Sequence, residues 1–240
     1  MSTMTQVSDA TDRITLRRRN DRRRRWLLAG IAALVVALLA TAAWLVLGSD
    51  VLGVRTVAVS GNSITNTDDV RRLAELPTGT PLARVDLEGV ATRVAGLPAV
   101  KTVKVAREWP NTVTVQITER NPLFAIETPG GYWIADDQGV VFKSSADADG
   151  LMVASVSNGD PRLIRDLGAV LSALPAGLRS RVDKVGADTV DSIVLYLPGG
   201  NRIVWGSADQ SPLKAQVVVP LLKQQGTVYD VSAPSNPTVR

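Results

Sequence analysis

The most constraining feature of this 240-residue sequence is one uncharged apolar run near its beginning. The run is WLLAGIAALVVALLATAAWLVL, from Trp26 to Leu47. About 20 apolar residues at a rise of 1.5 Å each are enough to cross a hydrocarbon core of about 30 Å. Trp26 and Trp44 lie near the two ends of the run, where amphipathic rings prefer the membrane interface. The sequence therefore predicts a single transmembrane helix over residues 26–47, in contact with the lipid bilayer.

Arginines crowd the segment directly before this run, whereas Gly48, Ser49 and Asp50 follow it. The positive-inside rule then places the basic tail, residues 1–25, in the cytoplasm and everything after the span outside. Basic arms also bind nucleic-acid phosphates. Because this cluster adjoins an apolar run, we interpret it as a membrane-orientation signal and expect no nucleic-acid partner. The arginines nearest to the span are Arg22, Arg23, Arg24 and Arg25.

A cleaved signal peptide is the competing interpretation of the same segment. The small residues Ala40, Thr41 and Ala42 resemble a cleavage site. The apolar run continues past them to Leu47, which is longer than a usual signal core, and this favours an uncleaved anchor. Both interpretations export the remainder of the chain.

The chain contains neither cysteine nor histidine. This composition excludes disulfides, thiol nucleophiles and imidazole bases, and it removes the usual ligands of zinc and haem. We therefore expect no cofactor and no metal site, and a fold held together by its apolar cores alone.

Residues 51–120 have the pattern of a small α+β unit. A strand around Val57 and Val59 is followed by helices that begin near Thr65 and Asp86. Two alternating strands, VKTVKVARE and TVTVQITER, flank a turn at Trp109-Pro110-Asn111 and predict a hairpin. The expected order is β-α-α-β-β, with the helices covering one face of the sheet.

Residues 121–232 change to short apolar runs broken by Gly, Asp and Asn. They predict a mainly antiparallel β domain with packed helices, one beginning at Asp160-Pro161 and another at Ser211-Pro212. On the second helix Leu213, Val217 and Leu221 form the expected inward stripe. Residues 233–240 form a proline-bearing C-terminal tail.

Asp136 and Asp137 are the adjacent acids of this second unit and therefore its candidate catalytic residues. Two carboxylates can hydrolyse glycosidic bonds. These two lie in a glycine-bearing turn, DDQG, whose turn chemistry accounts for them. Lys184, Lys214 and Lys223 would be bases only if buried. We therefore expect a non-enzyme without a small-molecule substrate.

Instead of a catalytic site, we expect the edges of the β-sheet to bind other proteins. An unpaired edge can accept a strand from another protein through backbone hydrogen bonds. The last predicted strand is expected at the edge of the sheet, with Pro234 and Pro237 stopping further pairing. Its candidate partner-binding residues are Val228, Tyr229, Asp230, Val231 and Ser232.

Several segments together resemble the FtsQ/DivIB family of bacterial cell-division proteins. The β-α-α-β-β unit just outside a single anchor looks like a POTRA domain. AREWPNTVTVQITERNPLFAI, residues 106–126, is similar to the strand-turn-strand that ends this domain in the family, and VRTVAVSGNSITNTDDV is similar to its opening. The hairpin YWIADDQGVVF and the segment RIVWGSADQSPLKAQVVVPLL resemble the family's β domain, and the closing tail resembles actinobacterial members.

The resemblance implies a scaffold of the division complex in the inner, cytoplasmic membrane at the division septum. The implied partners are FtsB/FtsL-type membrane coiled-coil proteins and the septal wall-synthesis machinery, one of them docked on the C-terminal part of the β domain by strand addition. Two alternatives stay open: a membrane-anchored cell-wall enzyme or regulator, and a POTRA-bearing export or chaperone component. Such an export component usually precedes an outer-membrane barrel, for which this chain has too few strands.

Overall fold

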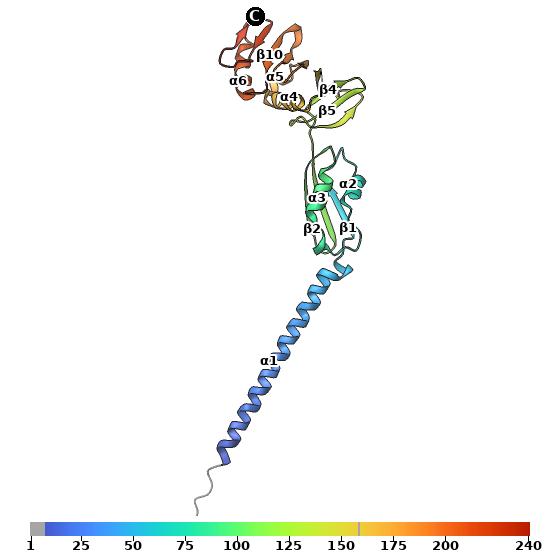
Figure 1. Ribbon diagram of the computed structural model, residues 1–240, viewed down its shortest axis with the longest axis vertical. Helices are drawn as coiled ribbons and strands as arrows, with labels where there is room; N and C mark the ends of the chain where they lie inside the picture. The colour runs from blue at the N-terminus through green and yellow to red at the C-terminus, as the bar shows by residue number, and fades with distance from the viewer. Residues whose placement is uncertain (1–7, 158) are drawn as a thin grey trace, which may run out of the picture.

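The computed structural model describes residues 8–157 and 159–240, with the side chains before Arg24 outside the described part. Helix α1, Ser8–Gly48, continues into two folded units (Figure 1). Its exposed segment Arg24–Gly48 is apolar and long enough to cross a membrane. The predicted tail is thus helical from Ser8 onward. Arg24 and Arg25 are exposed, while the side chains of Arg22 and Arg23 lie outside the described part.

The first folded unit has the predicted β-α-α-β-β order. It contains β1 (Thr56–Ser60), α2 (Thr67–Ala74), α3 (Leu87–Ala95), β2 (Val100–Glu108) and β3 (Thr112–Glu119). The sheet order is β1-β3-β2, with β1 parallel to β3 and β2 antiparallel to it. Inward residues of β3 alternate along the strand and pack against α2 and α3, namely Val113, Val115 and Ile117 against Val70, Val90 and Val94.

The second unit is one sheet with helices on it. Its strands are β4 (Phe124–Thr128), β5 (Gly131–Ala135), β6 (Val141–Ser145), β7 (Met152–Val156), β8 (Lys184–Ala187), β9 (Ile193–Tyr196), β10 (Arg202–Gly206), β11 (Val228–Asp230) and β12 (Thr238–Val239). The strand order is β12-β11-β10-β9-β8-β7-β4-β5-β6. Five of the eight pairs among the described residues are antiparallel. The mixed α+β prediction is confirmed.

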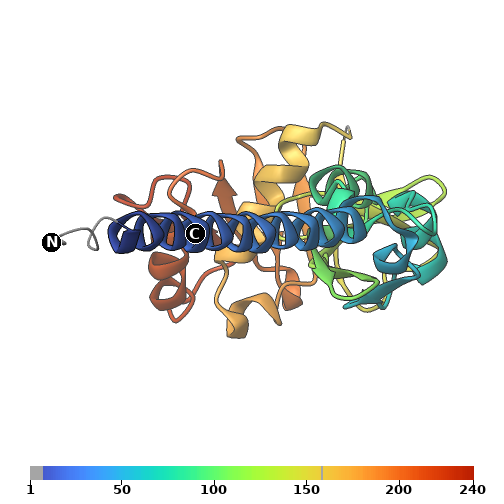
Figure 2. The same cartoon turned by 90° about the horizontal axis from the view of Figure 1, so that it is seen from below.

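Three helices accompany this sheet: α4 (Pro161–Ala173), α5 (Ala176–Arg179) and α6 (Ser211–Leu221). Asp160 caps α4 through its carboxylate, which accepts the N–H of Arg162. Residues of α4 and α6 share one apolar core with the inner face of the strands, including Leu167, Val218 and Trp205. Figure 2 shows the molecule from below, with α1 crossing in front of the folded part.

The predicted inward stripe of α6 is partly wrong. Leu213 is 44% exposed, and the residues that turn to the sheet are Lys214, Ala215, Val218 and Leu221. The reason is that α6 is apolar on more than one side, so spacing alone leaves its rotation open.

Glu119, the last residue of β3, closes the first unit by binding the loop that follows the neighbouring parallel strand β1. Its carboxylate accepts the N–H groups of Ser63, Ile64 and Thr65 at 2.8, 2.9 and 2.6 Å. Successive backbone N–H groups of this kind form an anion-binding concavity. Burial alone would raise the pKa of Glu119, but the N–H of Ile64 and the bonds from Ser63 and Thr65 outweigh it and lower the pKa to about 2.

The depressed pKa predicts how the first unit responds to acid. Because the folded-state pKa lies below the ordinary value of 4.5, the stabilisation is present above pH 4.5 and is lost as the pH falls toward about 2. Glu119→Gln removes the charge and should lower the free energy of unfolding at neutral pH by about 1–2 kcal/mol after allowance for solvent screening. Urea unfolding followed by circular dichroism measures this loss.

Thr114→Ala is the matched control on the same strand, since the Thr114 hydroxyl donates to the exposed Glu108 and makes no contact with the loop at residues 63–65 among the described hydrogen bonds. The control should retain the acid sensitivity between pH 4.5 and 2, and Glu119→Gln should have a flatter profile there. Equal profiles for the two variants would contradict the role given to Glu119.

Candidate docking surface and domain junction

The C-terminal end of the large sheet is built from β10, β11 and β12. β11 is parallel to β10, with Ile203 opposite Tyr229. β12 is antiparallel to β11, with Val239 opposite Tyr229 and Thr238 opposite Asp230. The last residue extends this pairing, because Arg240 donates its N–H to the carbonyl of Val228 at 2.9 Å and accepts the N–H of Val228 at 3.0 Å.

The expectation that residues 228–232 form the edge of the sheet is wrong. The two prolines do not stop the pairing: Pro234 lies inside a tight turn in which the N–H of Asn236 donates to the carbonyl of Ala233, and Pro237 follows that turn. The chain then returns as β12 and covers β11. Whether residues 228–232 contact a partner stays a prediction, and main-chain contact with the strand itself would require β12 to move.

Two of the five predicted docking residues belong to the core. Tyr229 is 4% exposed, and its hydroxyl donates to the carbonyls of Gln224 and Gly226. Val231 is buried and donates its N–H to the carbonyl of Val204. Asp230 is half-buried, and its carboxylate accepts the N–H and hydroxyl of Ser232. Of the five, Val228, Asp230 and Ser232 are the ones with accessible surface.

The free edge is short and centred on Val239. Residues of an antiparallel pair alternate between those that bond the partner strand and those whose N–H and C=O face away. Since Arg240 exchanges both bonds with Val228, the main-chain groups of Val239 point outward from the sheet. Among the described residues β12 has a strand on one side only. These groups are what an added strand would bind.

Lys214, on α6, lies against the end of β10 and is buried, as a lysine base would have to be. It is 1% exposed, and its Nζ donates to the carbonyls of Trp205 and Ser207 at 3.0 and 2.9 Å. Burial lowers the pKa of Lys214, opposed by the charges of Asp209, Asp191 and Asp230. The amine is buried and donates to two backbone carbonyls, so it fixes α6 to the end of β10.

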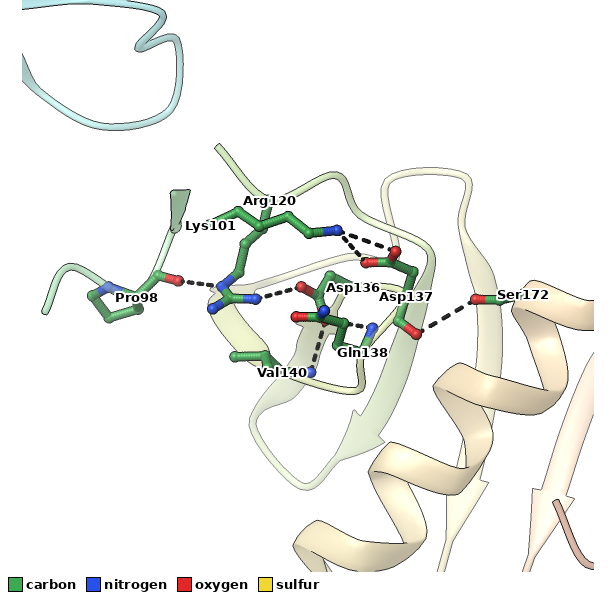
Figure 3. Close-up of polar contacts among 8 residues, drawn as sticks. All are labelled: Pro98, Lys101, Arg120, Asp136, Asp137, Gln138, Val140 and Ser172. Atoms are coloured by element: carbon green, nitrogen blue, oxygen red, sulfur yellow. Dashed lines mark hydrogen bonds and ion pairs between the residues drawn. The ribbon is translucent and has the colours of Figure 1, made fainter. Parts of the chain in front are cut away.

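The two folded units meet at Asp136 and Asp137, in the turn after β5 (Figure 3). The carboxylate of Asp136 is 0% exposed, and one of its oxygens accepts the N–H groups of Gln138 and Val140. The other oxygen lies 2.6 Å from Nη1 of Arg120, the residue after β3. Arg120 also donates through Nε to the carbonyl of Pro98, which ties it to the first unit.

This pair is an ionised one. Burial alone would raise the pKa of Asp136, but the N–H of Val140, the Arg120 guanidinium and the N–H of Gln138 lower it below its ordinary value. A second pair joins Nζ of Lys101 to the carboxylate of Asp137 at 2.8 Å, but both side chains are partly exposed. Exposed pairs contribute about 0–1 kcal/mol, whereas removing one partner of a buried pair costs about 3–5 kcal/mol. The Arg120–Asp136 pair therefore dominates the junction.

Helix α4 presses on the other side of the same turn. A Cβ on Gly139, whose φ is +70°, would come within 2.6 Å of the backbone of Arg165, and a Cβ on Gly168 would lie 2.7 Å from the nitrogen of Gly139. The Ser172 hydroxyl donates to the carbonyl of Asp137. The turn is thus packed between the first unit and α4, and the predicted turn role of its two acids agrees with this geometry.

Sequence reasoning missed Lys101 and Arg120 as junction residues. Arg120 ends TVTVQITER, the second strand of the predicted hairpin, yet it binds a carboxylate 16 positions later in another domain. The one available signal was the strand period, because neighbouring residues at the end of a strand point to opposite faces. That period predicts that the side chains of Glu119 and Arg120 point to opposite faces, but it does not predict which residues they contact.

The junction geometry predicts unequal effects for its two cations. Arg120→Ala leaves the buried Asp136 carboxylate without its cation and should destabilise the second unit by about 3 kcal/mol. Lys101→Ala, the matched control, should cost less than about 1 kcal/mol because its pair is exposed. Urea unfolding followed by tryptophan fluorescence measures both losses. Similar losses in the two variants would refute a dominant Arg120–Asp136 pair.

Comparison with known proteins agrees with this architecture. Residues 52–120 match the family model "POTRA domain, FtsQ-type", and residues 125–233 match "Cell division protein FtsQ/DivIB, C-terminal". Cell division protein FtsQ of Streptomyces bingchenggensis is 36% identical over 236 residues, covering 93% of this chain and 88% of that protein. FtsQ of Mycolicibacterium smegmatis is 36% identical over 211 residues, covering 87% of this chain and 63% of that protein.

A solved structure, the major extracytoplasmic domain of DivIB from Geobacillus stearothermophilus, aligns at a TM-score of 0.36 and 14% identity, covering 50% of this chain and 98% of that one. The sequence matches span both folded units and, in the Streptomyces protein, nearly the whole chain. This chain belongs to the FtsQ/DivIB family of bacterial cell-division proteins.

Proposed function

We propose that this chain is a non-catalytic scaffold of the division complex, anchored by residues 26–47 in the cytoplasmic membrane at the septum. Its arginine-rich tail stays in the cytoplasm, and its two folded units stand outside. It recruits FtsB/FtsL-type membrane coiled-coil proteins and so connects them to the septal wall-synthesis machinery. Family membership supports the division role, and the apolar helix Arg24–Gly48 supports the anchor.

The observation that carries the scaffold proposal is the short free edge of β12. Its outward groups at Val239 offer one main-chain donor and one acceptor beside a well-packed sheet. Strand addition uses such groups for affinity and the alternating side chains for specificity. In contrast, the acids that a wall hydrolase would need are each bound to a cation at the domain junction. This engagement favours a binding function over hydrolysis.

The edge proposal predicts that Val239→Pro weakens binding of the coiled-coil partner at least about tenfold. Proline removes an N–H that points away from β11 and blocks an added strand, while the sheet keeps its internal bonds. Titration of purified full-length chain in detergent with the exported part of an FtsB-type partner measures the affinity. Val239→Ala is the control: it removes side-chain packing but keeps the N–H, and it should bind with near-native affinity.

Tyr229→Asp is unsuitable for this purpose, because a charge at a buried position unfolds the edge rather than testing it. Thermal unfolding must therefore accompany each titration. Equal partner affinity in the proline and alanine variants of Val239, with both folded, would rule out β12 as the docking edge.

The topology proposal predicts that external protease digests the folded units in intact spheroplasts and spares the arginine-rich tail. The mature chain should still contain residues 26–47, as shown by mass spectrometry of the purified protein. A fluorescent fusion should form a band at midcell in dividing cells. A protected C-terminal part, a mature chain that begins after Ala42, or a uniform membrane signal would each contradict the anchored septal scaffold.

A further inference from the structure

Helix α6 has a second apolar face that the sheet does not use. Its inner face packs on the core through Ala215, Val218 and Leu221. On its outer side, Val219 is 43% exposed and Pro212 and Pro220 are also exposed. A helix that is apolar on several sides is normally covered on each of them. The outer face of α6 therefore has the composition of a surface that another molecule covers.

Two hollows lie side by side along this face. One, of about 450 Å³, is bounded by the end of α4 and by α6, and the other, of about 290 Å³, by α5 and the end of α6. They share Pro175 and Val219, so together they form one trough between α6 and the α4–α5 connection. The α6 residues that line the trough recur at helical spacing, namely Pro212, Ala215, Gln216, Val219 and Pro220, and Leu222 and Lys223 line it from the segment just after the helix.

Two cationic side chains lie at one end of the trough. Arg181 and Lys223 line its narrower end, both are exposed, and neither forms an ion pair within the described part of the chain. An occupant that buries apolar side chains in the trough and presents carboxylates to Arg181 and Lys223 would satisfy both features.

We propose that this trough, defined by the residues named above, binds an amphipathic helix of a partner protein that carries an apolar stripe and acidic flanks. A helix fits because the lining residues of α6 recur every three or four positions, as ridges that a second helix can pack against. The chain's own membrane is a poor occupant, since the first folded unit stands between α1 and this end of the molecule (Figure 1). The trough is separate from the β12 edge and goes beyond the proposed scaffold contact.

The test uses two synthetic helical peptides of about 18 residues, or about five helical turns. Both carry leucine at positions i, i+3, i+4 and i+7, and they differ only in having glutamate or lysine on the flanks. Fluorescence anisotropy against full-length chain in detergent should show the glutamate peptide binding at least about fivefold tighter than the lysine peptide. Reversing the rim with Arg181→Glu and Lys223→Glu together should invert that preference.

Val219→Glu should abolish binding of the glutamate peptide, because it places a like charge in the middle of the trough. Leu213→Glu is the matched control, since Leu213 lies on the same helix with nearly the same exposure, 44%, but does not line the trough. Circular dichroism confirms that both variants fold. Partner capture through β12 should be unchanged in both, which separates this proposal from the strand-addition proposal.

Three results would overturn the trough proposal. The first is equal affinity for the glutamate and lysine peptides, or equal loss in the two variants. The second is self-association, seen by sedimentation, that Val219→Glu abolishes and Leu213→Glu retains; the occupant would then be a second copy of this chain. The third is Val219-dependent binding to vesicles of anionic lipid in preference to the glutamate peptide, which would indicate a lipid surface.

Discussion

The buried ion pair between Arg120 and Asp136 is the interaction that fixes the second unit to the first. It depends on the alternation of a β-strand, because Glu119 and Arg120 are neighbours that point in opposite directions. Glu119 binds the loop at residues 63–65 and closes the first unit. Arg120 crosses to the turn of the second unit while remaining bonded to Pro98. One dipeptide thus completes one domain and fixes the next domain against it, so the position of the second unit follows that of the first.

The elements that sequence reasoning could predict are those with a strong local period. The strand alternation of residues 100–119 and the capped helix after Asp160 both appear at nearly the predicted residues. Their side-chain pattern is set by their own neighbours, so it can be seen without knowing the fold. β12 has only two residues and follows two prolines, so it has no local pattern at all. It forms because it pairs with β11. This pairing makes β12 the edge strand and places residues 228–232 one strand inside the edge at which they were expected.

The junction was hidden from the sequence for a related reason. Lys101 and Asp137 lie 36 positions apart, and nothing in the spacing of either predicts the contact. The turn chemistry of DDQG was predictable from its composition, but the use of its two carboxylates was not. The burial of Lys214 could not be predicted either, because it follows from the rotation of α6 about its axis. In a helix that is apolar on several sides, the sequence does not determine that rotation. Long-range polar contacts and helix rotation therefore required the structure.

The β12 edge and the trough share α6, yet they draw on different faces of it. The inner face carries Lys214, which holds β10, and the loop after the helix provides the carbonyl that Tyr229 of β11 binds. The outer face, with Val219, contributes to the trough without touching these bonds. A substitution on the outer face therefore leaves the support of the edge in place. Two partners could then bind the same domain at once, because each would use a surface that the other leaves free.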